Sequence, residues 1–291
     1  MGDVALETAT ESLGDGRHTA MVHDDWEIWG PCGGYVAAIA LRAAGADSPL
    51  VRPASFFCHY LSVAAFAPVD LVVTPLRAGR TVLAQRVEMT QEGRPVLDAM
   101  VWSVGDVAGL EHEDVSPPDV PGPDELPTRE ELWVARDGAA GTDSAGTDGG
   151  EDDDNVPYAF WGNFDQRMVE WSSTWPPTEP LPPTWRTWVR CRPTATFDDP
   201  WIDAARSLIV LDVGSWPAGS RPHMYLDPPF IAPSLDLYAS FQYPGSGSPW
   251  ILLDAHSPVA QGGLLSWTGR VWSDDRKLIA SGGGQAVFRH T

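Results

Sequence analysis

The sequence predicts an α+β protein made of two similar halves, each a single helix wrapped by an antiparallel sheet. Three observations predict this fold class. One helix signal is followed by several short strands, the same order returns later in the chain, and an acidic segment poor in apolar residues separates the two occurrences. The 28 glycines and 27 prolines agree with many turns and short elements.

The first helix is predicted in the run that opens at Gly33 and closes at Gly45. One apolar stripe follows the spacing i, i+3, i+4 and i+7, formed by Val36, Ile39, Ala40 and Ala43. The stripe is rich in alanine, so a sheet can approach the helix closely. Gly45 is a natural residue for the position just past a helix end.

Short strand-like segments surround this helix, and turns rich in glycine, proline or charge separate them. The segments are residues 5–13, 17–30, 54–63, 69–76, 80–91 and 96–104. Gln91-Glu92-Gly93-Arg94 is typical of a hairpin turn. The predicted order is strands, one helix, then a meander of antiparallel strands.

An acidic segment over residues 111–155 interrupts this order. It holds 15 acidic and two basic residues, so it carries more than half of the formal net charge of -21. Proline, glycine and aspartate dominate it, and such a composition cannot bury enough apolar surface to stay folded. We expect one domain at 1–110 and another at 156–291, joined by a flexible acidic linker at 111–155; an acidic segment with its own function is the alternative.

The first pattern returns loosely after this segment. A second helix is predicted over residues 199–214, with Asp199-Pro200 as its start. Strand-like segments precede and follow it at residues 157–171, 184–193, 233–243, 249–259, 263–275 and 277–290. Pro53-Ala54-Ser55 and Pro233-Ser234-Leu235 each open a strand after a helix, which indicates an internal duplication.

Composition and motifs argue against several classes of protein function. A chain with this much negative charge is a poor candidate for binding nucleic acid, whose phosphates are also negative. Three cysteines without a CxxC pattern, no signal peptide and no long apolar run favour a cytoplasmic protein that does not interact with a membrane. No Walker, dinucleotide-binding or GxSxG motif is present, so no cofactor is expected. His23-Asp24-Asp25 is a poor metal site because neighbouring strand residues point to opposite faces.

At particular residues the sequence resembles the thioesterase superfamily related to bacterial type II acyl-CoA thioesterases. The resemblance rests on Gly33-Gly34 before the helix, Leu76-Arg77-Ala78-Gly79-Arg80, the Ser234-Leu235-Asp236 strand, and residues 269–289. It implies a double hotdog, in which two half-domains pair their sheets into one long antiparallel sheet. It also implies an acyl-CoA or related thioester as ligand.

The same resemblance implies a catalytic aspartate, which we assign to Asp236 because an acid is out of place in the apolar strand around it. The alternative is a solvent-facing residue of an alternating strand. The family pairs its aspartate with a hydroxyl residue and a glutamine. Pro258 and Gly284 occupy those positions here, so the neighbouring Ser257 and Gln285 become the candidates.

His256, beside Ser257, is a candidate substitute for the family's hydroxyl residue. The alternatives are that Ser257 is a turn residue and that His256 is a surface histidine. The backbone N–H groups of Gly33, Gly34 and Tyr35 could bind substrate and stabilise an oxyanion at the helix start; tight packing of the glycine pair is the alternative.

Arg77 and Arg80 flank a turn and could bind the CoA phosphates, although a solvated turn explains them equally well.

The leading functional hypothesis is an acyl-CoA thioesterase that hydrolyses its substrate with an Asp-activated water. A non-catalytic acyl-thioester binding protein with a degenerate site is the alternative, motivated by the shifted hydroxyl and glutamine. A hotdog hydratase is a third possibility, but its His/Asp motif is not visible in residues 35–45. Exposed sheet edges and faces also suggest a homodimer.

Overall fold

The computed structural model describes residues 1–291 except 140–157, 173–176, 225–229, 246 and 291. In the first half, the central helix is α2 (Gly33–Ala46), and the strands are β1 (Glu11–Gly14), β2 (Arg17–Met21), β3 (Arg52–Tyr60), β4 (Pro68–Ala78), β5 (Val82–Gln91) and β6 (Arg94–Val104). A short helix α1 (Val4–Glu7), capped by Asp3, lies where the sequence predicts the first strand.

In the second half, the helices are α4 (Pro200–Val213) and α5 (Ser215–Ser220), and the strands are β7 (Phe164–Met168), β8 (Thr184–Cys191), β10 (Asp236–Phe241), β11 (Ile251–Gln261), β12 (Leu264–Ser273) and β13 (Leu278–Val287). The remaining elements are the 3-10 helices η1 (Asp24–Trp26), η2 (Pro123–Glu125) and η3 (Ala159–Asn163), helix α3 (Arg129–Ala139), and the paired strands β9 (Phe230–Ile231) and β14 (Arg289–His290).

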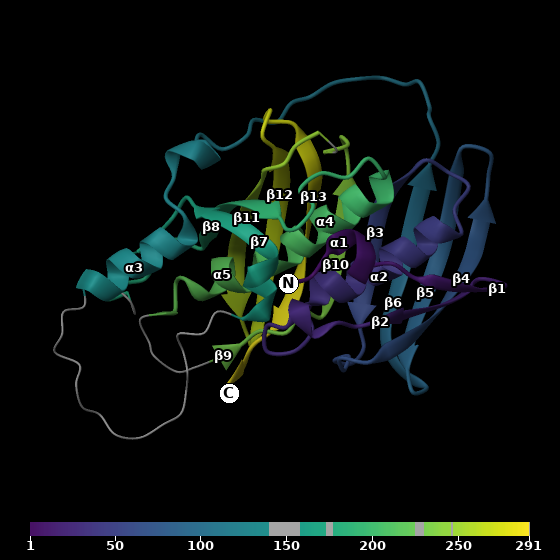
Figure 1. Cartoon of the computed structure of the whole chain (residues 1–291), viewed down its shortest axis with the longest axis horizontal. Helices are drawn as coiled ribbons and strands as arrows, with labels where there is room; N and C mark the ends of the chain where they lie inside the picture. Colours follow the sequence, from purple (N-terminus) through teal and green to yellow (C-terminus); the bar gives the residue numbers. More distant parts are fainter. Residues whose placement is uncertain (140–157, 173–176, 225–229, 246, 291) are drawn as a thin grey trace.

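One continuous sheet joins the two halves (Figure 1). Its order among the described strands is β1-β2-β4-β5-β6-β3-β10-β13-β12-β11-β8-β7. The order β2-β4-β5-β6-β3 in the first half corresponds to β8-β11-β12-β13-β10 in the second, with a helix before β3 and before β10. The predicted duplication is therefore confirmed. The halves meet where β3 pairs antiparallel with β10, with Asp236 opposite His59.

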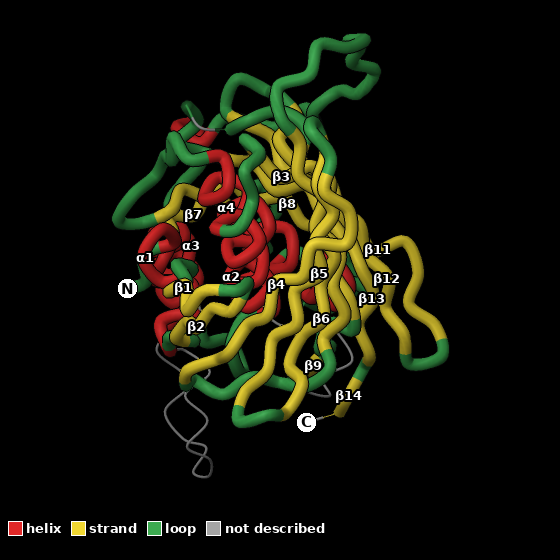
Figure 2. The backbone as a smooth tube through the Cα atoms, turned by 90° about the vertical axis from the view of Figure 1, so that its right-hand side faces the viewer, coloured by secondary structure: helices red, strands yellow, loops and turns green. Residues whose placement is uncertain are grey.

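The helices gather on one side of the curved sheet (Figure 2). α2 and α4 run antiparallel, since Gly34 near the start of α2 approaches the end of α4 and Gly45 near its end approaches Trp201. A Cβ atom at Gly34 would lie 2.9 Å from the Ile209 Cα, so only glycine permits this helix approach. Asp199 caps α4 by accepting from the Trp201 N–H, which confirms the predicted helix start.

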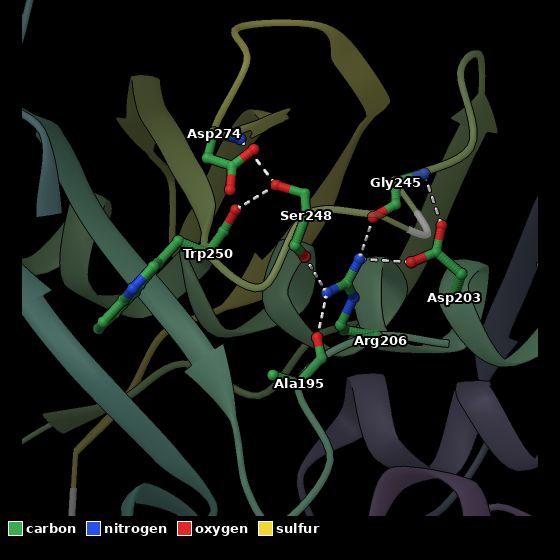
Figure 3. A network of polar contacts seen from close by, with 7 residues as sticks. All are labelled: Ala195, Asp203, Arg206, Gly245, Ser248, Trp250 and Asp274. Atoms are coloured by element: carbon green, nitrogen blue, oxygen red, sulfur yellow. Dashed lines mark hydrogen bonds and ion pairs between the residues drawn. The ribbon is translucent and has the colours of Figure 1, made fainter. Parts of the chain in front are cut away.

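A buried ion pair fixes the loop between β10 and β11 to α4 (Figure 3). Arg206 pairs with Asp203 and donates hydrogen bonds to the carbonyl oxygens of Ala195, Gly245 and Ser248. Asp203 also accepts a hydrogen bond from the Gly245 N–H at 2.7 Å. The guanidinium and the carboxylate thereby replace most of the water that they lose on burial.

Part of the segment 111–155 packs against the second half, which corrects the expectation of a wholly flexible linker. Val120 is buried in an apolar cluster that includes Trp188. The Trp188 indole N–H donates to the Pro121 carbonyl, and the Arg276 guanidinium donates to the carbonyls of Pro118 and Val120. The segment is held through its backbone carbonyls, a contribution that residue composition does not reveal. Residues 140–155 lie outside the described residues, and the domain boundaries stay a prediction.

Candidate functional site

A buried carboxylate lies where the end of α4 meets the start of α2. Asp212 is 6% exposed. Its Oδ2 accepts a hydrogen bond from the Gly34 backbone N–H at 2.7 Å, and its Oδ1 accepts one from the Ser234 hydroxyl at 3.1 Å. The Cys32 thiol lies 3.8 Å from Oδ2. The carboxylate is thus inside the protein with donors directed at both oxygens.

The local sequence explains this placement. Gly34 has no side chain, so the last turns of α4 approach the first turn of α2 and bring Asp212 to an unpaired N–H of the helix terminus. The positive end of the α2 dipole favours negative charge at this point. Ser234 reaches Asp212 from the residues just before β10.

Burial dominates the electrostatics of Asp212. Loss of water raises the pKa of this carboxyl above its ordinary value, while the hydrogen bonds from Gly34, Ser234 and Cys32 act in the opposite direction. A buried acid with a raised pKa is suited to accept a proton during a reaction. Asp212 is therefore the carboxylate whose environment fits a general base.

Tyr60 approaches the same point from the end of β3. A Cβ atom at Gly33 would lie 3.2 Å from the Tyr60 hydroxyl oxygen and 3.0 Å from Asp212 Oδ2. The two oxygens are therefore separated by no more than the sum of those distances. Burial raises the pKa of Tyr60 well above its ordinary value, with further increases from Cys58 and Asp212, so its hydroxyl stays protonated.

The three residues predicted as catalytic do not gather at one point. Asp236 Oδ1 accepts a hydrogen bond from the Gln285 backbone N–H at 2.9 Å. Asp236 is half-buried, and strand alternation groups it with exposed Tyr238, opposite to buried Leu237. Asp236 and Gln285 are thus neighbours on the sheet face away from the helices.

Ser257 lies elsewhere, on β11, which β12 and β13 separate from β10. It is buried, and its hydroxyl donates to the Ser266 carbonyl at 2.8 Å. His256 is exposed beside it. The structure therefore gives Ser257 a contact within its own hairpin, and the catalytic roles of Asp236, Ser257 and Gln285 stay predictions.

The predicted glycine pair does lie at the helix start, but the backbone N–H groups of Gly34 and Tyr35 already donate hydrogen bonds within the protein. The Gly34 N–H binds Asp212, and the Tyr35 N–H donates to the Cys32 carbonyl at 3.1 Å. The Tyr35 side chain is fully buried, stacks on Trp26 and donates its hydroxyl hydrogen to the Glu7 carbonyl. Tyr35 is therefore a core residue.

Arg77 and Arg80 are both exposed at the turn from β4 to β5. Their predicted contact with CoA phosphates stays a prediction.

Asp212 and its neighbours Ser234 and Tyr60 were not predicted from the sequence as site residues. A signal for Asp212 existed, because an acid interrupts the apolar run of residues 208–213 as Asp236 interrupts its strand. In the described part of the chain, no cluster of three or more His, Cys, Asp or Glu side chains could hold a metal. Within the same residues, no helix combines the length and apolar character needed to cross a membrane.

Two family models match this chain. The model of the acyl-CoA thioesterase N-terminal domain matches residues 22–104, and that of the acyl-CoA thioesterase C-terminal domain matches residues 135–287. The second match begins inside the predicted linker, at α3.

Solved structures share the fold over the whole chain. An acyl-CoA thioesterase II from Mycobacterium marinum is 20% identical, with a TM-score of 0.75 and 99% of each chain covered. A hot dog fold protein from Alicyclobacillus acidocaldarius is also 20% identical, with a TM-score of 0.78, covering 100% of this chain and 99% of that one. Since the family models match more than half of its residues, the chain belongs to the acyl-CoA thioesterase family and has a double hotdog fold.

Proposed function

We propose that this protein hydrolyses an acyl-CoA thioester with a water molecule that Asp212 activates. One observation carries the proposal: the Asp212 carboxylate is buried at the start of α2, with a hydrogen-bond donor on each oxygen. Burial raises the pKa of this carboxyl, which makes it a stronger base than an aspartate in water. Asp236 was the carboxylate expected from the sequence, and it stays the competing assignment.

The proposed reaction conserves atoms and charge. Asp212 accepts one proton from water while the water oxygen forms a bond to the thioester carbon. The oxyanion that develops on the carbonyl is stabilised by the positive end of the α2 dipole and by the Gly33 N–H. When the C–S bond breaks, the CoA thiolate takes the proton back from Asp212, and the free acid and thiol leave.

Thiol release from a panel of acyl-CoAs of different chain length tests the function. Paired variants assign the base: we expect Asp212→Asn to lose at least about a hundredfold in kcat and Asp236→Asn to resemble wild type. Asparagine can still accept from the Gly34 N–H and can donate its own N–H to the Ser234 hydroxyl, so the variant should fold. The opposite pattern would assign the base to Asp236. No thiol release by wild-type protein from any acyl-CoA would contradict the proposed function.

One observation favours a second candidate, an acyl-thioester binding protein without turnover. Gly284 offers no side chain at the position where the resemblance implies a glutamine. Such a protein would show a rise in Tm with an acyl-CoA while releasing no thiol above background.

A homodimer and a cytoplasmic location remain part of the proposal. The sheet face away from the helices carries the exposed aromatic residues Phe57, Trp102 and Tyr238, which lie on adjacent strands and suit contact with a second copy. Sedimentation equilibrium would give the mass in solution, and a monomer at micromolar concentration would contradict the dimer.

A further inference from the structure

The Tyr60 hydroxyl is buried and forms no hydrogen bond with a nitrogen or oxygen atom of the described residues. The hydroxyl interacts with the sulfur of Cys58, a weak hydrogen-bonding partner whose side chain is itself fully buried. A hydroxyl removed from water without a good partner costs folding free energy, and phenylalanine would fill the same volume without that cost. The hydroxyl therefore calls for an explanation other than packing.

The position of the hydroxyl supplies that explanation. The Tyr60 hydroxyl oxygen and Asp212 Oδ2 both lie beside Gly33, on the side where any other residue would carry a Cβ atom. A molecule between them meets the Asp212 carboxylate, which accepts hydrogen bonds, and the neutral Tyr60 hydroxyl, which can donate one. A thioester carbonyl oxygen can only accept, so it fits the contact with Tyr60 and not the contact with Asp212. Water can donate to the carboxylate and accept from the phenol.

We infer that the Tyr60 hydroxyl donates a hydrogen bond to the water molecule that Asp212 activates, an inference that rests on the proposed function. The water uses one lone pair to accept from Tyr60 and the other to attack the thioester carbon, while its proton passes to Asp212. The phenol keeps its own proton throughout, in agreement with the upward shift of its pKa on burial. Tyr60 is then a catalytic residue that holds the nucleophile in line.

This assignment makes the site common to both halves. Tyr60 and Gly33 come from the first half, and Asp212 and Ser234 from the second. It also supplies a polar side chain that the second half lacks at Gly284. The donor comes from β3, which is adjacent to β10 at the junction of the two halves.

Tyr60→Phe tests the inference, with Tyr243→Phe as the matched control because that hydroxyl belongs to an exposed residue outside the site. We expect Tyr60→Phe to lower kcat about a hundredfold, the scale of losing the alignment of a reacting group, with KM changed less than about threefold. Its Tm should equal or exceed that of wild type, because the change removes a buried hydroxyl that lacks a good partner. Tyr243→Phe should match wild type in kcat and KM.

Each other result has a definite meaning. If wild type releases thiol and Tyr60→Phe retains its kcat, the inference is wrong and the proposed function stands. If kcat and Tm fall together, the hydroxyl has a structural role and the inference is again wrong. If wild type releases no thiol from any acyl-CoA, the proposed function fails and this inference fails with it.

Discussion

The carboxylate of Asp212 accepts a hydrogen bond from the backbone N–H of Gly34 at 2.7 Å, across 178 positions of the chain. This bond connects the end of α4 in the second half to the start of α2 in the first. The close approach of the two helices, which Gly34 permits, is what removes Asp212 from water. The relationship that joins the two halves therefore also sets the chemistry of the proposed base.

The pH dependence of the rate should reflect this burial. The proposed base must be ionised, so kcat/KM should rise as pH increases through the pKa of Asp212. Because burial raises that pKa, the rate should rise at a pH above the pKa of an ordinary aspartate, about 3.9. This rise is the rising limb of the pH–rate profile. A pH–rate profile of thiol release measures this limb. A limb within the ordinary aspartate range would contradict the role of Asp212.

Ser234→Ala should move that limb further upward. The Ser234 hydroxyl donates to Asp212 and lowers the pKa of its carboxyl, so its removal leaves the effect of burial less opposed. The same pH–rate profile provides the measurement.

Ser257→Ala is the matched control, because Ser257 contacts the Ser266 carbonyl and not Asp212. We expect it to keep the wild-type limb while losing about 1 kcal/mol of unfolding free energy. If the rising limb of the pH–rate profile is unchanged in Ser234→Ala, or displaced in Ser257→Ala, then Ser234 is not the hydroxyl residue that sets the pKa of the base.

The two adjacent glycines should respond differently to alanine. In Gly33→Ala the added methyl group would lie 3.0 Å from Asp212 Oδ2 and 3.2 Å from the Tyr60 hydroxyl, where side chains can shift by a few tenths of an ångström. We expect it to fold and to lose at least about tenfold in kcat, since the methyl group narrows the space between the two oxygens in which the proposed water must be aligned.

In Gly34→Ala the added methyl group would lie 2.9 Å from the Ile209 Cα, and a backbone cannot yield so easily. That variant should lose stability first, seen as a lower Tm. Equal Tm losses in both variants would show that Gly33 is needed for packing and not for an open reaction space.

Asp203→Asn should destabilise the protein by about 3–5 kcal/mol, because it leaves the buried charge of Arg206 without its counterion. Guanidinium chloride unfolding followed by tryptophan fluorescence measures the change. Asp98→Asn is the control: it breaks a pair with Arg86 whose side chain is 42% exposed, so the loss should be much smaller. Similar losses in the two variants would mean that burial does not govern the strength of these pairs.

The local elements and their repetition can be predicted from the order of the amino acids alone. The helix predicted from Gly33 to Gly45 ends at Ala46, and the helix predicted over residues 199–214 spans Pro200–Val213. The turn at Glu92-Gly93 also forms as predicted, with both residues at positive φ. Such features follow from apolar periodicity and turn chemistry within a few residues, and these are the properties that a sequence displays directly.

Which acid is buried, and what surrounds it, depends on how the two halves pack together. In the sequence, Asp212 and Asp236 are alike, each an acid inside an apolar segment. They differ because α4 approaches the glycine start of α2, while β10 turns Asp236 to the other face of the sheet. The packing of Val120 on Trp188 has the same origin. Burial arises from contacts between distant segments, so no pattern within one segment can specify it.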